Sequence, residues 1–73
     1  MNSEIPAEVK RALIEQEIIL HKNTAYQLNL RHRVNKKLGA TTEELKPLED
    51  ELIKHEQAID ILKEELVHVE EKE

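Results

Sequence analysis

Aliphatic residues recur at alternating steps of three and four along the C-terminal part of this chain. The series reads Leu45, Leu48, Leu52, His55, Ile59, Leu62, Leu66 and Val69. A seven-residue repeat of this kind is typical of a helix that packs lengthwise against another helix. The pattern predicts a helix from about residue 47 to about residue 71, and His55 is the one position in its seam that is not aliphatic.

The N-terminal part of the chain predicts a second long helix, from about residue 4 to residue 38. Ser3 is a candidate N-cap, Pro6 suits the first turn, and Gly39 suits the left-handed position that ends a helix. Residues 39–46 are then the turn between the helices. Within that turn, Thr41 and Glu44 have the spacing of a capping box, which would start the next helix earlier. Pro47 opposes the earlier start, because proline has no N–H to give to a helix interior.

The short connection predicts an antiparallel hairpin of two neighbouring helices, an all-α fold like an antiparallel coiled coil. The seam predicted for the first helix reads Leu13, Gln16, Leu20, Asn23, Gln27, Leu30 and Val34. Aligning Val34 with Leu48 brings Gln27 opposite His55. A buried amide or imidazole without a partner is costly, so we expect Gln27 and His55 to form a hydrogen-bonded layer that fixes the register.

This seam leaves apolar positions of the first helix without a partner. One further stripe contains Ile14, Ile18, Ala25 and Leu28, and another contains Ile5, Val9, Ala12, Ile19 and Tyr26. A helix that is apolar on several sides is expected to be covered on several sides, and a core of this size seldom stabilises itself. We therefore expect a homodimeric four-helix bundle with the stripe from Ile5 to Tyr26 in its interface. The alternative is that these residues are scattered surface apolars, which are common.

Composition narrows the class of protein. The 73 residues include no Cys and one aromatic residue, and 37% of them are charged, as in long amphipathic helices. No apolar run reaches the ~18 residues of a membrane span and no secretory signal opens the chain, so a soluble, cytoplasmic protein is expected. An enzyme is not expected, because a hairpin this short offers no concave pocket for a substrate.

Four histidines among many carboxylates raise the question of a metal. Pairs four residues apart are Glu17–His21, Glu51–His55 and Glu64–His68, and Glu65 precedes His68 by three. Carboxylate-bridged di-iron bundles need the three-residue spacing on two helices, and this chain has it on one. Such pairs are also ordinary features of a helix surface. The sequence therefore predicts no metal site and no cofactor.

Positive charge is concentrated just before the turn, in Arg31, Arg33, Lys36 and Lys37. Residues 1–40 carry a net charge of +3 and residues 41–73 a net charge of −8. The cluster is a candidate nucleic-acid patch, although it has no interleaved aromatics for base stacking. The alternative is that it complements the helix dipole and pairs with Glu43, Glu44, Glu49, Asp50 and Glu51 across the turn. We favour this structural interpretation.

A helical hairpin that dimerises through its long helices resembles in outline the Rop family of plasmid RNA-binding regulators. The resemblance implies the four-helix arrangement, and it carries no function because no motif is matched residue by residue. The sequence predicts a self-associating scaffold or accessory subunit without enzymatic activity. The alternative function is a small nucleic-acid-binding regulator that uses the cluster before the turn.

Overall fold

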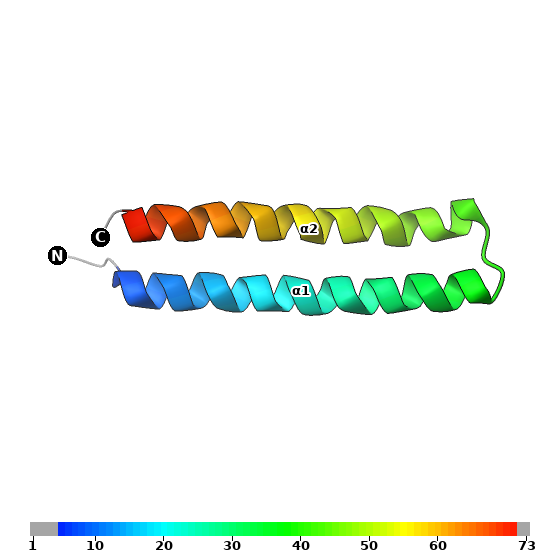
Figure 1. The fold of residues 1–73 in the computed structure, drawn as a ribbon, viewed down its shortest axis with the longest axis horizontal. Coiled ribbons are helices and arrows are strands. Elements are labelled where there is room, and N and C mark those ends of the chain that lie inside the picture. The colour runs from blue at the N-terminus through cyan, green and yellow to red at the C-terminus, as the bar shows by residue number, and fades with distance from the viewer. Residues whose placement is uncertain (1–4, 72–73) are drawn as a thin grey trace.

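The computed structural model describes residues 5–71 as two antiparallel helices, α1 (Ala7–Lys37) and α2 (Thr42–Glu71), joined by a short turn (Figure 1). The molecule is a rod of 58 × 19 × 14 Å. Its radius of gyration is 16.9 Å, whereas a compact domain of this length would have about 11 Å. The predicted all-α helical hairpin is confirmed, and the elongated shape gives each helix only one neighbour within the chain.

The first turn of α1 depends on backbone hydrogen bonds. The amides of Val9 and Lys10 both donate to the carbonyl of Pro6, which directly precedes the helix. The predicted N-cap, Ser3, lies outside the described residues. Proline suits this place because its fixed φ is compatible with the start of a helix. The helix thus begins at Ala7, with Pro6 as its cap residue.

The end of α1 is a Schellman motif. The Gly39 amide donates to the carbonyl of Lys36, and the Ala40 amide donates to the carbonyl of Asn35. Gly39 has a φ of +97°, in the left-handed region that glycine adopts without a steric penalty. These bonds satisfy carbonyls at the helix end that would otherwise lack partners. The predicted role of Gly39 as the stop of the first helix is confirmed.

The start of α2 is a capping box. The hydroxyl of Thr41 accepts from the Glu44 amide at 3.1 Å, and a Glu44 carboxylate oxygen accepts from the Thr41 amide at 2.8 Å. These two bonds satisfy N–H groups at the start of the helix, and the helix continues through Pro47. The helix begins at Thr42 and not near residue 47, which corrects the predicted boundary. The sequence showed both signals, and the reciprocal cap prevails over the one backbone bond that Pro47 removes.

The core of the hairpin is thin. Only three described residues are buried, each with 6–8% of its surface still exposed: Ile18 and Leu28 on α1, and Leu45 on α2. The other members of the predicted α2 seam are half-buried, and they are Leu48, Leu52, His55, Ile59, Leu62, Leu66 and Val69. The seam of α2 therefore lies as the seven-residue repeat indicated.

The seam of α1 differs from the prediction. The α1 residues that are buried or half-buried at alternating steps of four and three are Ala7, Arg11, Ile14, Ile18, His21, Ala25, Leu28 and His32. All members of the predicted seam, from Leu13 to Val34, are exposed. α1 thus uses a different side against α2, and the aliphatic residues of the predicted seam face away from it.

Candidate functional site

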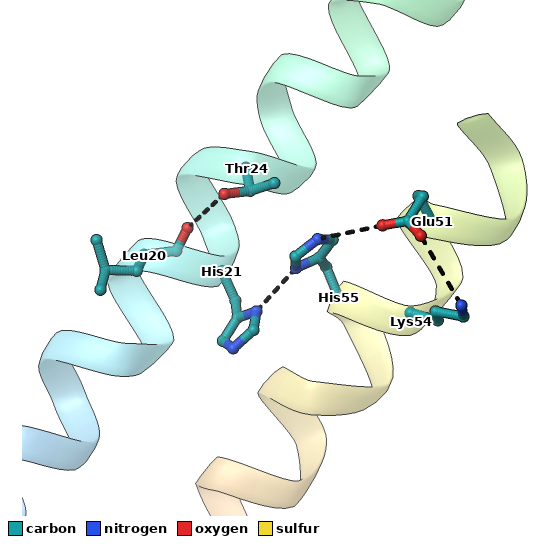
Figure 2. Close-up of polar contacts among 6 residues, drawn as sticks. All are labelled: Leu20, His21, Thr24, Glu51, Lys54 and His55. Carbon is teal, nitrogen blue, oxygen red and sulfur yellow. Dashed lines mark hydrogen bonds and ion pairs between the residues drawn. The ribbon is translucent and has the colours of Figure 1, made fainter. Parts of the chain in front are cut away.

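Two histidines meet in the middle of the hairpin (Figure 2). Nδ1 of His21 on α1 lies 2.8 Å from Nδ1 of His55 on α2, with the ring centroids 5.0 Å apart. A hydrogen bond between two Nδ1 atoms requires that one ring donates an N–H and the other accepts with a lone pair. The two half-buried rings therefore form the polar layer of the seam.

A carboxylate lies beside the histidine pair. Oε1 of Glu51, one turn earlier on α2, lies 3.9 Å from Nε2 of His55. The contact is longer than a hydrogen bond, and its effect on His55 is electrostatic. Figure 2 shows the chain of side chains from His21 through His55 to Glu51.

The histidine pair replaces the predicted layer of Gln27 and His55. Gln27 is exposed, and His21 holds the position opposite His55. Equal steps along the antiparallel helices from this contact bring Leu28 opposite Leu48 and Ile14 opposite Leu62. The register therefore differs from the predicted alignment of Val34 with Leu48.

Two further polar contacts cross the seam near its ends. Toward the turn, Nε2 of His32 lies 2.8 Å from Oε2 of Glu49. Near the start of α1, Nε of Arg11 lies 3.8 Å from Oε2 of Glu70. Both α1 residues belong to the observed seam, and their partners flank the seam of α2. Together with the contact between His21 and His55, these contacts link α1 and α2 at three heights within residues 5–71.

The histidine pair falls short of a metal site. Zinc sites in proteins use at least three protein ligands, and two imidazoles supply two. Among residues 5–71 no group of three or more His, Cys, Asp or Glu side chains is gathered closely enough to hold a metal ion. The contact between His21 and His55 is therefore interpreted as a structural hydrogen bond.

The side of α1 opposite α2, here called the outward face, carries the exposed large apolar side chains of this helix, with the polar residues Gln16, Asn23 and Gln27 among them. Figure 2 shows one of its members, Leu20, pointing away from α2 while the adjacent His21 points toward it. Helical periodicity groups the exposed large apolar side chains of α1 into one arc of about 100° opposite the seam. These side chains are Val9, Leu13, Ile19, Leu20, Tyr26, Leu30 and Val34.

The outward face includes most of the residues predicted to bind a second copy. Ile5, Val9, Ala12, Ile19 and Tyr26 are all exposed on the hairpin. Ile19 is 56% exposed, whereas its neighbour Ile18 on the seam is 8% exposed. Coverage of these residues by a second copy stays a prediction. The structure adds Leu13, Leu20, Leu30 and Val34, which sequence reasoning had assigned to the seam.

The cluster before the turn, Arg31, Arg33, Lys36 and Lys37, is exposed. Four of the five acids expected to neutralise it contact other groups. Glu44 belongs to the capping box, Glu49 contacts His32, Asp50 lies near Lys46, and Glu51 lies near Lys54 and His55. Within residues 5–71, none of the four cations makes an ion pair with an acid. The predicted pairing across the turn is therefore not found.

The turn itself forms a shallow depression that is open to solvent. Its lining includes Asn35, Leu38 and Glu44. Glu44 is the one ionisable side chain in the lining, and its carboxylate accepts from the Thr41 amide. The depression therefore offers little chemistry beyond the backbone groups of the turn.

Comparison with known proteins gives no relative: no family model, curated protein or solved structure matches the chain. Within residues 5–71, neither helix combines the length and the hydropathy needed to cross a lipid bilayer. The functional interpretation therefore rests on the two surfaces of α1, the outward face and the cluster before the turn.

Proposed function

We propose that this protein is a non-enzymatic, self-associating helical hairpin, whose outward face binds a second copy to complete a four-helix bundle that serves as a scaffold or accessory subunit. The observation that carries the proposal is the exposure of seven large apolar side chains on one side of α1, while only three of residues 5–71 are buried. A surface of this kind on a small chain is a typical protein-binding site.

The energies are of the right size for a dimer. Burying a half-exposed Leu, Ile, Val or Tyr side chain contributes about 1 kcal/mol, so the seven per copy contribute about 14 kcal/mol to a symmetric dimer. Association costs about 4–15 kcal/mol in lost motion. The outward face can therefore support self-association, and α1 would then lie at the centre of the bundle with α2 on its outer side.

Light scattering coupled to size exclusion, over a concentration series, tests the proposal. We expect a mass of twice the 8.6 kDa of one chain. Ile19→Asp should reduce the mass to that of one chain, because it places a charge in the centre of the outward face. The matched control is Gln57→Asp, a position on α2 that is also exposed, which should keep the dimer mass. A folded wild-type monomer at all concentrations would contradict the proposal.

A second candidate function is nucleic-acid binding by the cluster before the turn. The observation in its favour is that Arg31, Arg33, Lys36 and Lys37 are exposed and make no ion pair within the described part of the chain. Unpaired cations in one place attract phosphates, with an affinity that falls as salt rises. The cluster has no aromatic side chain beside it to stack on bases.

Titration of fluorescent RNA and DNA at low salt tests this candidate. Arg31→Glu with Arg33→Glu should abolish binding, whereas Lys10→Glu with Lys63→Glu, the same charge change elsewhere on the hairpin, should weaken it only slightly. Absence of binding by the wild type at low salt would remove nucleic acid as a ligand.

A further inference from the structure

The charges of the hairpin are divided along its length. In the half that contains the turn, residues 22–55, seven Lys and Arg stand against five Asp and Glu, a net charge of +2. In the half that contains the start of α1 and the end of α2, residues 5–21 and 56–71, nine acids stand against three bases, a net charge of −6. Because the helices are antiparallel, these segments form two physical ends of one rod (Figure 1).

The division is sharper on α1, which carries the outward face. Residues 22–37 contain five cations and no acid, and the five are Lys22, Arg31, Arg33, Lys36 and Lys37. Residues 7–21 contain three acids and two cations. The five cations of residues 22–37 make no ion pair within the described residues, so their charge is not neutralised by α2.

We propose that two hairpins bind outward face to outward face with their turns at opposite ends, so that the cationic half of each α1 lies beside the acidic end of the other copy. This inference rests on the self-association proposed above and specifies its geometry. The occupant of the outward face is a second copy of this chain, and the partner of the cluster before the turn is the far end of that copy.

Apolar burial alone does not select this orientation. The outward face extends from Val9 to Val34, nearly the whole of α1, so parallel and antiparallel pairs of α1 would both cover it. A two-fold axis can produce either arrangement, lying along the helices in one and across them in the other. Charge is what distinguishes the two arrangements.

In the parallel arrangement, ten uncompensated cations from two copies of residues 22–37 would lie beside one another. Packed helices are about 8–10 Å apart, a distance comparable to the Debye length of about 8 Å at physiological salt, so screening would leave much of the repulsion. In the antiparallel arrangement each cationic half meets acids, and the two α1 dipoles oppose each other favourably. The antiparallel pair also accounts for the absence of partners for these cations in the single hairpin.

Spin labels measure the orientation directly, and the chain has no cysteine to remove. Asn35→Cys places a label near the turn, at an exposed position outside both the outward face and the cluster before the turn. With turns at opposite ends and the two-fold axis at the middle of the outward face, the labels should be about 40 Å apart, from the 1.5 Å rise per residue. With turns at the same end, they should be within about 20 Å, given the spacing of packed helices.

A charge variant gives a second readout with opposite signs. Arg33→Gln with Lys37→Gln should raise the dimer Kd several-fold in the antiparallel arrangement, because attraction is removed. The same change should lower the Kd in the parallel arrangement, because repulsion is removed. The control is Lys46→Gln with Lys54→Gln on α2, which removes the same number of positive charges and which we expect to change the Kd less.

The outcomes separate the two proposals. A dimer mass with labels about 40 Å apart and a raised Kd supports both. A dimer mass with a short distance, or with a lowered Kd, overturns the orientation and leaves self-association standing. A wild-type monomer overturns self-association, and the orientation with it.

Discussion

The two sides of α1 both mix apolar and polar residues, and they differ in what their residues contact. The seam that faces α2 contains Arg11, His21 and His32 among small and aliphatic residues, whereas the outward face contains seven large apolar side chains with Gln16, Asn23 and Gln27 among them. Each of the three polar seam residues contacts a side chain on α2: Arg11 contacts Glu70, His21 contacts His55, and His32 contacts Glu49. Polar residues with matched partners distinguish the seam, and exposed large apolar side chains distinguish the outward face.

This comparison indicates which residues determine the surface against which a helix packs. Aliphatic surfaces pack against any other aliphatic surface of the right shape, so they contribute binding energy with little specificity. A half-buried imidazole accepts only a neighbour that satisfies its nitrogen atoms, and this restricts the register. In this hairpin the specific contacts hold the two helices of one chain together, and the less specific apolar surface remains for binding outside the hairpin.

The largest effect is expected from substitutions at two adjacent isoleucines, Ile18 and Ile19, which lie on different sides of α1. Ile18→Asp should abolish the helical circular dichroism signal, because a buried, unpaired carboxylate costs several kcal/mol and a domain this small has little stability to lose. At the same concentration Ile19→Asp should retain more of the signal, because its carboxylate is exposed to water on the hairpin. Equal loss of signal in the two variants would contradict the assignment of the two sides.

A double-mutant cycle on the polar layer should give a smaller effect. Thermal melts of His21→Ala, His55→Ala and the double variant should yield a coupling free energy of about 0.5–1.5 kcal/mol, because the two rings share a hydrogen bond. The same cycle on Gln27 and His55 should yield no coupling, since Gln27 lies on the other side of α1. Coupling between Gln27 and His55 would restore the register predicted from the sequence.

The smallest effect is expected at the edge of the seam. Glu49→Ala removes the acceptor of His32 and should lower the free energy of unfolding by about 0.2–1 kcal/mol, the range of partly exposed ion pairs. The control is Glu56→Ala, one heptad later on α2 and also exposed, which should lower the midpoint of thermal unfolding less. A larger loss from Glu56→Ala would show that the contact between His32 and Glu49 adds nothing to the pairing.

The sequence predicted an element of the fold correctly where a single pattern indicated it and no second pattern competed. The α2 seam was predicted from its repeat because no competing apolar stripe runs as far along that helix. Gly39 marked the end of the first helix because glycine accepts the left-handed conformation at little cost. The start of α2 was predicted wrongly, near residue 47, because Pro47 was weighed above the capping box that Thr41 and Glu44 form.

The seam of α1 was not predictable from hydrophobicity, because α1 is apolar on both sides. The signal that could have found it is the unbroken series of four- and three-residue steps from Ala7 to His32, together with acids on α2 at matching heights. The sequence also predicted ion pairs for the cluster before the turn, and the structure has none there within residues 5–71. The acids across the turn have several possible partners, and only the folded geometry decides that Glu49 and Glu51 contact histidines.

The turn that ends at Thr41 also favours pairing of α1 with α2 of the same chain over exchange of helices between two chains. If residues 38–41 were helical, α1 and α2 would join into one continuous helix about 98 Å long. Two such chains could exchange halves, with α2 of one lying on α1 of the other, and would remake the His21–His55 contact twice. Domain swapping of this kind needs no new interface. The left-handed conformation of Gly39 disfavours the continuous helix. A single glycine therefore favours the hairpin over the domain-swapped pair.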